Sequence, residues 1–143
     1  MTAPLPLPTR PLEILLVEDY EPDVLLARLA LEQCRLPSRI QVAWDGLDAL
    51  NMLRQEAPHE QAPHPDLILL DLHLPRMDGI QLLATLQHET CSADVPVVVL
   101  TTSPADLGLL GDLSELPRLY LEKPLTERHL NVVFRELYGS AVC

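Results

Sequence analysis

The chain has 143 residues, of which 48% are hydrophobic, and a formal net charge of -11 at pH 7. This length fits one domain that buries about two thirds of the surface of its unfolded form, so neither a disulfide nor a metal is needed for stability. The 10 Lys and Arg residues are scattered, whereas affinity for phosphate backbones comes mainly from clustered basic side chains. These features exclude direct nucleic-acid binding, and no segment reaches the roughly 20 apolar residues of a membrane-spanning helix.

Both ends of the chain are predicted to lie outside the domain. Residues 1–11 contain alternating prolines and lack the basic start and apolar core of a signal peptide, so we expect a disordered lead-in. Residues 139–143 are expected to form a C-terminal tail. The three cysteines, Cys34, Cys91 and Cys143, show no metal-ligand spacing, and their odd number predicts unpaired thiols in a reducing cytosol, hence a cytoplasmic protein.

The first predicted strand covers residues 12–17 and is followed directly by the acids Glu18 and Asp19. Pro22 suits the first turn of a helix, which is expected to end near Pro37. The apolar positions that indicate this helix by their spacing are Leu25, Leu26, Leu29 and Ala30. A strand, a loop and a helix therefore open the domain.

A second strand is predicted at residues 40–44, and Asp45-Gly46 turns the chain into a helix. The apolar positions of this helix are Leu47, Leu50 and Leu53. Residues 57–65 carry three prolines and no periodicity, which predicts a loop. We assign no metal-binding role to its histidines, because histidines on a proline-rich surface loop are most often solvated.

The segment from residue 66 to residue 79, DLILLDLHLPRMDG, organises the rest of the chain. Its apolar run at residues 67–70 is hydrophobic on both faces, as in a central strand of a parallel sheet covered by helices on each side. Asp71 stands where this strand leaves the core, and the carboxyl edge of an open α/β sheet is where binding sites form. Asp71 is therefore a candidate for chemistry, and the alternative is an aspartate that only caps a turn.

The remainder of the chain continues the alternation of strands and helices. A helix follows Gly79, and the β-branched run after Pro96 predicts a strand that ends in Thr101 and Thr102. A weak helix with two glycines follows, each glycine lowering helix stability by about 1 kcal/mol relative to alanine. A strand at residues 118–122 ends at Lys123-Pro124, and the last helix covers about residues 127–138. Five such alternations predict an α/β fold, a doubly wound five-stranded parallel sheet with five helices.

Acids, hydroxyls and a lysine should meet at one edge of this sheet. Carboxylates about 4 Å apart repel by roughly 4 kcal/mol per pair at an effective dielectric constant near 20, so a positive charge is needed among them. Mg²⁺ binds through carboxylate oxygens and fits a cluster without Cys or His ligands. Such a set could be a structural salt-bridge cluster, or it could position Asp71 as a nucleophile toward phosphorus. The residues concerned are Glu18, Asp19, Asp71, Thr101 and Lys123.

Five motifs in order carry a resemblance to a known family: the acid pair after strand one, Asp71, the LPRMDG sequence that follows it, Thr101 and Lys123-Pro124. Together they resemble the receiver domain of two-component response regulators, over residues 12–138. The LTTS run, the proline-rich insertion before the third strand and the lack of an output domain resemble the single-domain regulators that partner phytochrome-type histidine kinases, including bacteriophytochromes.

The resemblance implies a flavodoxin-like strand order of 2-1-3-4-5 and a phosphoacceptor role for Asp71, with a phosphohistidine of a sensor histidine kinase as donor. It implies that Mg²⁺ is held by Glu18, Asp19, Asp71 and the backbone carbonyl of His73. Thr101 and Tyr120 become the switch residues, Lys123 the phosphate-binding residue, and Thr102 and Pro124 neighbours of the phosphate site. It also implies a cis bond between Lys123 and Pro124. The protein would be a signalling protein without enzymatic activity beyond self-phosphorylation and self-dephosphorylation, acting through protein contact.

Three alternatives stay open at the level of sequence. A phosphohydrolase would also use an aspartate nucleophile, but such enzymes need a second acid two residues later, where this chain has His73. A flavin or nucleotide binder would need a glycine-rich loop after the first strand, where this chain is acidic. The third alternative is a receiver domain that takes no phosphate and serves as an adaptor.

A homodimer is expected through the face formed by the fourth helix, the fifth strand and the fifth helix. The fifth strand lies at an edge of the sheet in the implied order, and Val132 points away from the apolar face of the last helix. The leucines of the fourth helix cover about half its circumference, which is wider than the roughly 100° stripe of a core-facing helix. These leucines are Leu107, Leu109, Leu110, Leu113 and Leu116. The alternative is that they are scattered surface residues.

Overall fold

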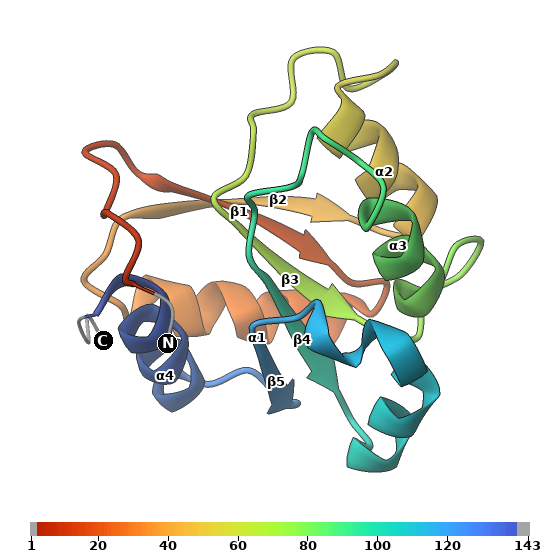
Figure 1. Cartoon of the computed structure of the whole chain (residues 1–143). Helices are drawn as coiled ribbons and strands as arrows, with labels where there is room; N and C mark the ends of the chain where they lie inside the picture. The colour runs from red at the N-terminus through yellow and green to blue at the C-terminus, as the bar shows by residue number, and fades with distance from the viewer. Residues whose placement is uncertain (1–2, 140–143) are drawn as a thin grey trace.

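A computed structural model describes residues 3–139 of the chain, and its core is one five-stranded parallel sheet (Figure 1). The strand order is β2-β1-β3-β4-β5, which confirms the predicted fold class and topology. The strands are β1 (Leu12–Val17), β2 (Ser38–Ala43), β3 (Leu67–Asp71), β4 (Val97–Thr101) and β5 (Leu119–Glu122). All residues of β3 and β4 are buried, as expected of central strands that pack on both faces.

Within residues 3–139, four helical segments connect the strands and a fifth follows β5, and one of the five is not an α-helix. The α-helices are α1 (Glu21–Glu32), α2 (Gly46–Arg54), α3 (Gly79–Leu86) and α4 (Glu127–Tyr138). The predicted weak helix between β4 and β5 is a 3₁₀ helix, η1 (Pro104–Glu115), drawn in cyan in Figure 1. Gly111 interrupts it with a φ of +53°, a conformation that glycine adopts without a steric penalty.

The helices cover the two faces of the sheet in separate groups (Figure 1). Helices α1 and α4 pack on one face, where Phe134 of α4 is fully buried beside Leu12 and Leu16 of β1. Helices α2, α3 and η1 cover the other face, where Leu50 and Leu82 pack on alternate residues of the same strands. Helix α1 buries Val24, Ala27, Ala30 and Leu31, whereas the leucines that indicated it from sequence, Leu25, Leu26 and Leu29, are 57%, 42% and 45% exposed.

The lead-in predicted to be disordered makes specific contacts with the domain at Leu5 and Arg10. The backbone N–H of Leu5 donates to the carbonyl of Leu137 at 2.7 Å, and the Leu5 side chain packs against the core. The Arg10 guanidinium pairs with both carboxylate oxygens of Asp66, at 2.7 and 2.9 Å. This segment therefore supplies a donor to the Leu137 carbonyl and a cation to the Asp66 carboxylate. Its prolines restrict the freedom of its backbone.

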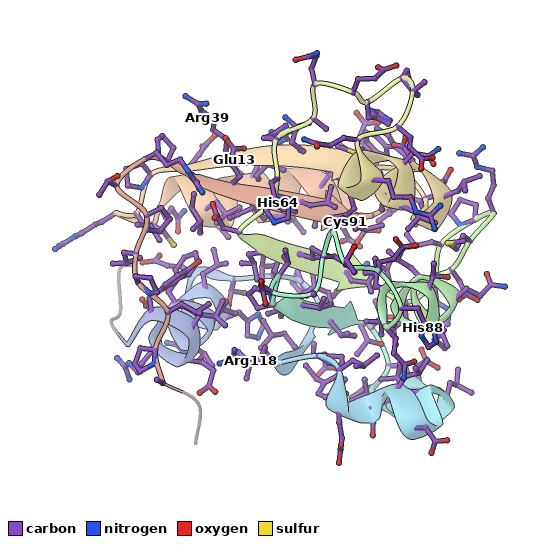
Figure 2. The ribbon with its side chains drawn as sticks, turned by 45° about the horizontal axis from the view of Figure 1, so that its top comes forward. Glu13, Arg39, His64, His88, Cys91 and Arg118 are labelled. Atoms are coloured by element: carbon purple, nitrogen blue, oxygen red, sulfur yellow. The ribbon has the colours of Figure 1, made fainter. Side chains whose placement is uncertain are left out.

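The expectation of unpaired thiols holds for one of the two described cysteines. Cys91, in the loop before β4, is a free cysteine (Figure 2), whereas Cys34 is disulfide-bonded, so the prediction of an unpaired thiol is wrong there. Cys143 and the predicted tail from residue 140 onward lie outside the described residues. Within residues 3–139, no helix has the length and apolar character needed to cross a membrane.

Candidate functional site

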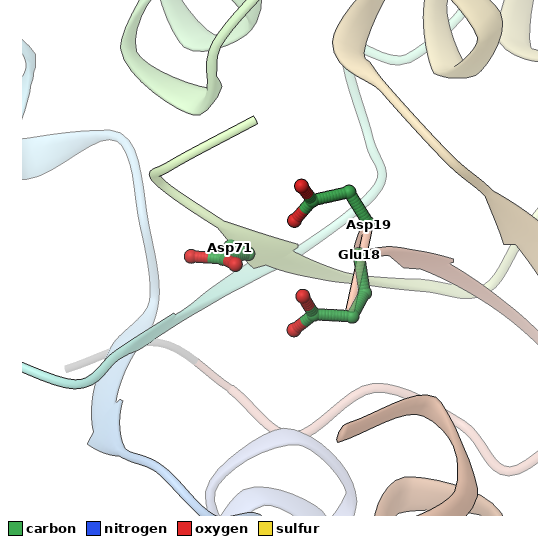
Figure 3. A group of neighbouring side chains, drawn as sticks. All are labelled: Glu18, Asp19 and Asp71. Atoms are coloured by element: carbon green, nitrogen blue, oxygen red, sulfur yellow. The ribbon is translucent and has the colours of Figure 1, made fainter. Parts of the chain in front are cut away.

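Three carboxylates meet at the carboxyl edge of the sheet, where β1 and β3 end (Figure 3). Oxygen atoms of Glu18, Asp19 and Asp71 all lie within 4.8 Å of one another. Glu18 is 1% exposed and Asp71 is 6% exposed, whereas Asp19 is exposed to solvent. The parallel sheet therefore brings together the acids that the sequence placed at separate strand ends.

The acid pair is held by the backbone at the end of β1. The N–H of Glu18 donates to the carbonyl of Ala43 at 3.0 Å and extends the pairing of β1 with β2. The Glu18 carboxylate in turn accepts a hydrogen bond from the N–H of Tyr20 at 3.1 Å. The turn between β1 and α1 is thus fixed with Glu18 directed into the protein.

The loop after β3 positions Asp71 through close backbone contacts. The N–H of His73 donates to Oδ1 of Asp71 at 3.1 Å, and the N–H of Gly79 donates to the carbonyl of Leu72 at 2.9 Å. A Cβ atom at Gly79 would lie 2.4 Å from the carbonyl oxygen of Asp71, so this approach requires glycine. Asp78 then caps α3 by accepting from the N–H of Gln81, which explains the Asp-Gly pair that closes the loop.

Lys123 lies at the centre of the cluster with its side chain only 7% exposed. Its ammonium donates to Oε2 of Glu18 at 2.5 Å, to Oδ2 of Asp71 at 2.8 Å and to Oδ2 of Asp23 at 3.0 Å. The sequence predicted the first two partners and missed Asp23. A signal was available, because an acid in the first turn of the helix after β1 stands at the same edge of the sheet.

The charges of the cluster do not balance. Burial raises the pKa of Glu18 to about 7, although the Lys123 bond opposes this rise. Burial lowers the pKa of Lys123, but its bonds to Asp71 and Glu18 raise it by more, so the ammonium stays charged. One ammonium pairs with Glu18, Asp23 and Asp71, and Asp19 adds a further carboxylate beside Glu18 and Asp71. An all-oxygen set with excess negative charge fits a hard divalent cation such as Mg²⁺.

The other predicted site residues lie around this cluster with partners of their own. The hydroxyl of Thr101 is buried, donates to the carbonyl of Ser103 at 3.0 Å and accepts from its N–H at 3.1 Å. The hydroxyl of Tyr120 donates to the carbonyl of Ser114, and its ring packs partly buried beside η1. Thr102 and Pro124 are exposed, and the Lys123-Pro124 bond is cis, as predicted.

The side chain of His73 makes a second contact that the sequence did not indicate. Its Nε2 lies 2.6 Å from Oδ2 of Asp106, and this bond raises the pKa of His73. The pair connects the loop after β3 with the first turn of η1. No sequence pattern indicated this pair, because the two residues are separated by 33 positions and both are ordinary surface types.

Comparisons with known proteins identify the family of the chain. Residues 14–135 match the family described as response regulator receiver domain. The response regulator Rcp1 of Synechocystis sp. (strain ATCC 27184 / PCC 6803 / Kazusa) is 36% identical over 129 residues, which cover 90% of this chain and 86% of that protein. A crystal structure of the Mn(2+)-bound form of Rcp1 superposes with a TM-score of 0.72 at 35% identity, covering 87% of this chain and 90% of that chain.

Two further solved structures are similar over most of the chain. The phosphorylated cyanobacterial phytochrome response regulator RcpA has a TM-score of 0.74 at 35% identity, with coverage of 87% of this chain and 90% of that chain. The bacteriophytochrome response regulator AtBRR has a TM-score of 0.81 at 32% identity, with coverage of 94% and 96%. The resemblance to phytochrome-associated response regulators that the motifs indicated is thereby confirmed.

Proposed function

Because this chain belongs to the family of response regulator receiver domains, we propose that it accepts a phosphoryl group from a sensor histidine kinase on Asp71. The observation that carries this proposal is the position of the Asp71 carboxylate, which lies 2.8 Å from the Lys123 ammonium and beside the Glu18 and Asp19 oxygens. The phosphorylated form would then signal through protein contact.

The transfer follows from the chemistry of these side chains. An Asp71 oxygen attacks the phosphorus of a phosphohistidine, so an O–P bond forms, the N–P bond breaks and the imidazole leaves. Lys123 neutralises an oxygen of the incoming group, because its ammonium already points at the acceptor carboxylate. Mg²⁺ held by Glu18, Asp19, Asp71 and the backbone carbonyl of His73 would neutralise further phosphoryl charge.

Thr101, the last residue of β4, and Tyr120 of β5 are proposed to change their contacts when Asp71 is phosphorylated. The Thr101 hydroxyl would exchange its bond to the Ser103 carbonyl for one to a phosphoryl oxygen. The Tyr120 hydroxyl would leave the carbonyl of Ser114, which frees the ring to turn inward. Thr102 follows Thr101 in the chain and Pro124 follows Lys123, and we propose that both lie at the rim of the phosphate site.

The kinase partner is proposed from the relatives. RcpA is a phytochrome response regulator and AtBRR a bacteriophytochrome response regulator, so we propose a phytochrome-type histidine kinase, including a bacteriophytochrome, as the phosphodonor. A phosphohydrolase is less well supported, because His73 stands at the position of the required acid and is paired with Asp106. Incubation with acetyl phosphate and Mg²⁺, followed by intact mass, tests whether the chain accepts a phosphoryl group: one added phosphoryl group supports this role, and an unchanged mass contradicts it.

Mg²⁺ at millimolar concentration is expected to raise the melting temperature. A ligand that binds only the folded state stabilises it by about 2.7 kcal/mol at a concentration 100 times its Kd, equivalent to a shift of several degrees. Asp19→Asn should weaken this shift and, since it relieves repulsion with Glu18 and Asp71, should make the metal-free protein more stable. Asp94→Asn, which removes an exposed acid of the loop before β4, is the control. A melting temperature that does not respond to Mg²⁺ would rule out the metal site.

A homodimer is proposed through η1, β5 and α4, with an interface narrower than the sequence suggested. Leu110 is 3% exposed and belongs to the core, so it cannot take part, whereas Leu109, Leu116 and Val132 are 61%, 38% and 51% exposed. Phosphorylation of Asp71 should tighten the dimer if Tyr120 moves beneath this face.

Light scattering at micromolar concentration, with and without beryllofluoride, measures the dimer. Leu109→Asp and Val132→Asp are expected to give a monomer, because each places an unpaired charge in an apolar interface. Leu25→Asp, on the exposed face of α1, serves as the control and should leave the mass unchanged. A monomer in every state would show that the dimer does not form. A dimer that persists in both Leu109→Asp and Val132→Asp would place the interface elsewhere.

A further inference from the structure

The Lys123 ammonium donates to three carboxylates, and these differ in whether they also belong to the proposed cation and phosphoryl site. Glu18 and Asp71 belong to the oxygen cluster that fits a cation, and Asp71 is also the proposed phosphoryl acceptor. Their oxygens face new partners once a cation and a phosphoryl group arrive. Asp23 lies outside that cluster and still has Lys123 as its partner, at 3.0 Å.

We propose that Asp23 is a positioning residue that holds the Lys123 ammonium at the phosphoryl site during transfer. Its carboxylate keeps one Lys123 hydrogen bonded while Glu18 and Asp71 turn to the cation and the phosphoryl group. Lys123 then cannot swing away or compete with the cation for the other two carboxylates. The inference rests on the proposed function of Asp71, and Asp23 acts only through Lys123, without touching the phosphoryl group.

Both ends of this contact are fixed by the backbone. Asp23 lies in the first turn of α1, where its N–H donates to the carbonyl of Tyr20 at 3.0 Å and the adjacent Val24 is buried in the core. Lys123 follows β5 directly, and its own N–H donates to the carbonyl of Thr101 at 2.8 Å. The contact therefore joins two rigid parts of the fold that are 100 residues apart in the sequence.

A positioning role differs from a general effect of negative charge, and two substitutions at Asp23 separate them. Asp23→Asn removes the charge but keeps a side-chain oxygen that can accept from Lys123, whereas Asp23→Ala removes both. Glu21→Ala removes an exposed carboxylate from the same turn of α1 and is the matched control. A field effect would follow charge in all three variants, whereas a positioning effect would appear in Asp23→Ala and be largely rescued in Asp23→Asn.

Lys123 is the only lysine of the chain, which allows a direct observation of its ammonium. Protein labelled with ¹⁵N-lysine should give one side-chain ammonium signal by NMR, and slow hydrogen exchange of that signal reports bonded hydrogens. We expect the wild-type signal to persist in Mg²⁺ alone. Asp23→Ala should keep the signal without metal, where Glu18 and Asp71 still hold Lys123, and lose it in Mg²⁺ alone, where no phosphoryl mimic is present to bind the ammonium.

The rate of phosphorylation by acetyl phosphate supplies the second measurement. Asp23→Ala is expected to slow it by about tenfold, as for loss of one charge-assisted hydrogen bond in the transition state, with Asp23→Asn and Glu21→Ala close to wild type. A wild-type rate and a persistent ammonium signal in Asp23→Ala would overturn the inference, as would equal slowing by Glu21→Ala. If the wild-type protein takes up no phosphoryl group, the proposed function of Asp71 fails. If the wild-type protein is phosphorylated and the Asp23 variants match it, only the inference about Asp23 fails.

Discussion

Asp71→Asn is expected to reduce phosphoryl labelling by a phosphorylated histidine kinase at least ~100-fold, because the amide that replaces the carboxylate is a poor nucleophile. The fold should survive the change, since Asn has nearly the same volume and Lys123 keeps its bonds to Glu18 and Asp23. Removal of one negative charge from the cluster also lowers the repulsion among the remaining acids. Labelling is measured by intact mass after incubation with the kinase, and folding by circular dichroism.

The control for this experiment is Asp112→Asn, which removes an exposed acid from η1 and leaves the cluster intact. This variant should be labelled like wild type. Labelling of Asp71→Asn at the wild-type level would show that another side chain accepts the phosphoryl group. The peptide that carries the added mass would then identify that side chain.

Lys123→Met is expected to destabilise the metal-free protein by about 3–5 kcal/mol, the range for breaking a buried ion pair by removing one partner. Methionine fills much the same space, but it leaves Glu18, Asp23 and Asp71 without a cation. Mg²⁺ should restore part of the lost stability, because it neutralises the same carboxylates. Urea unfolding with and without Mg²⁺ gives both free energies.

A matched control separates burial from charge. Arg39 and Glu13 form an ion pair at 3.6 Å across β2 and β1 (Figure 2), and their side chains are 69% and 12% exposed. Solvent screens this pair from the Arg39 side, and exposed pairs are worth roughly 0–1 kcal/mol, so Arg39→Met should destabilise the protein far less than Lys123→Met. If Lys123→Met costs as little as Arg39→Met, the cluster does not depend on the ammonium for its stability.

The sequence determined the fold class and the central residues of the site. Apolar runs that alternate with helical periods define a parallel sheet, and right-handed crossovers place the carboxyl ends of all strands at one edge. Residues that directly follow a strand are therefore brought together whatever the details of packing. Glu18, Asp19 and Lys123 follow strands and Asp71 is the last residue of one, and for that reason they could be assigned to one cluster before the structure was known.

Only the tertiary structure decided which residues complete that cluster and which helix faces are buried. Helix α1 has apolar residues on more than one side, so its periodicity indicated a helix without showing that Val24 and Ala27, and not Leu25, face the core. The contact of Asp23 with Lys123 depends on the rotation of α1 about its axis. That rotation is set by packing against the sheet and α4, a property of the assembled core that no local sequence pattern contains.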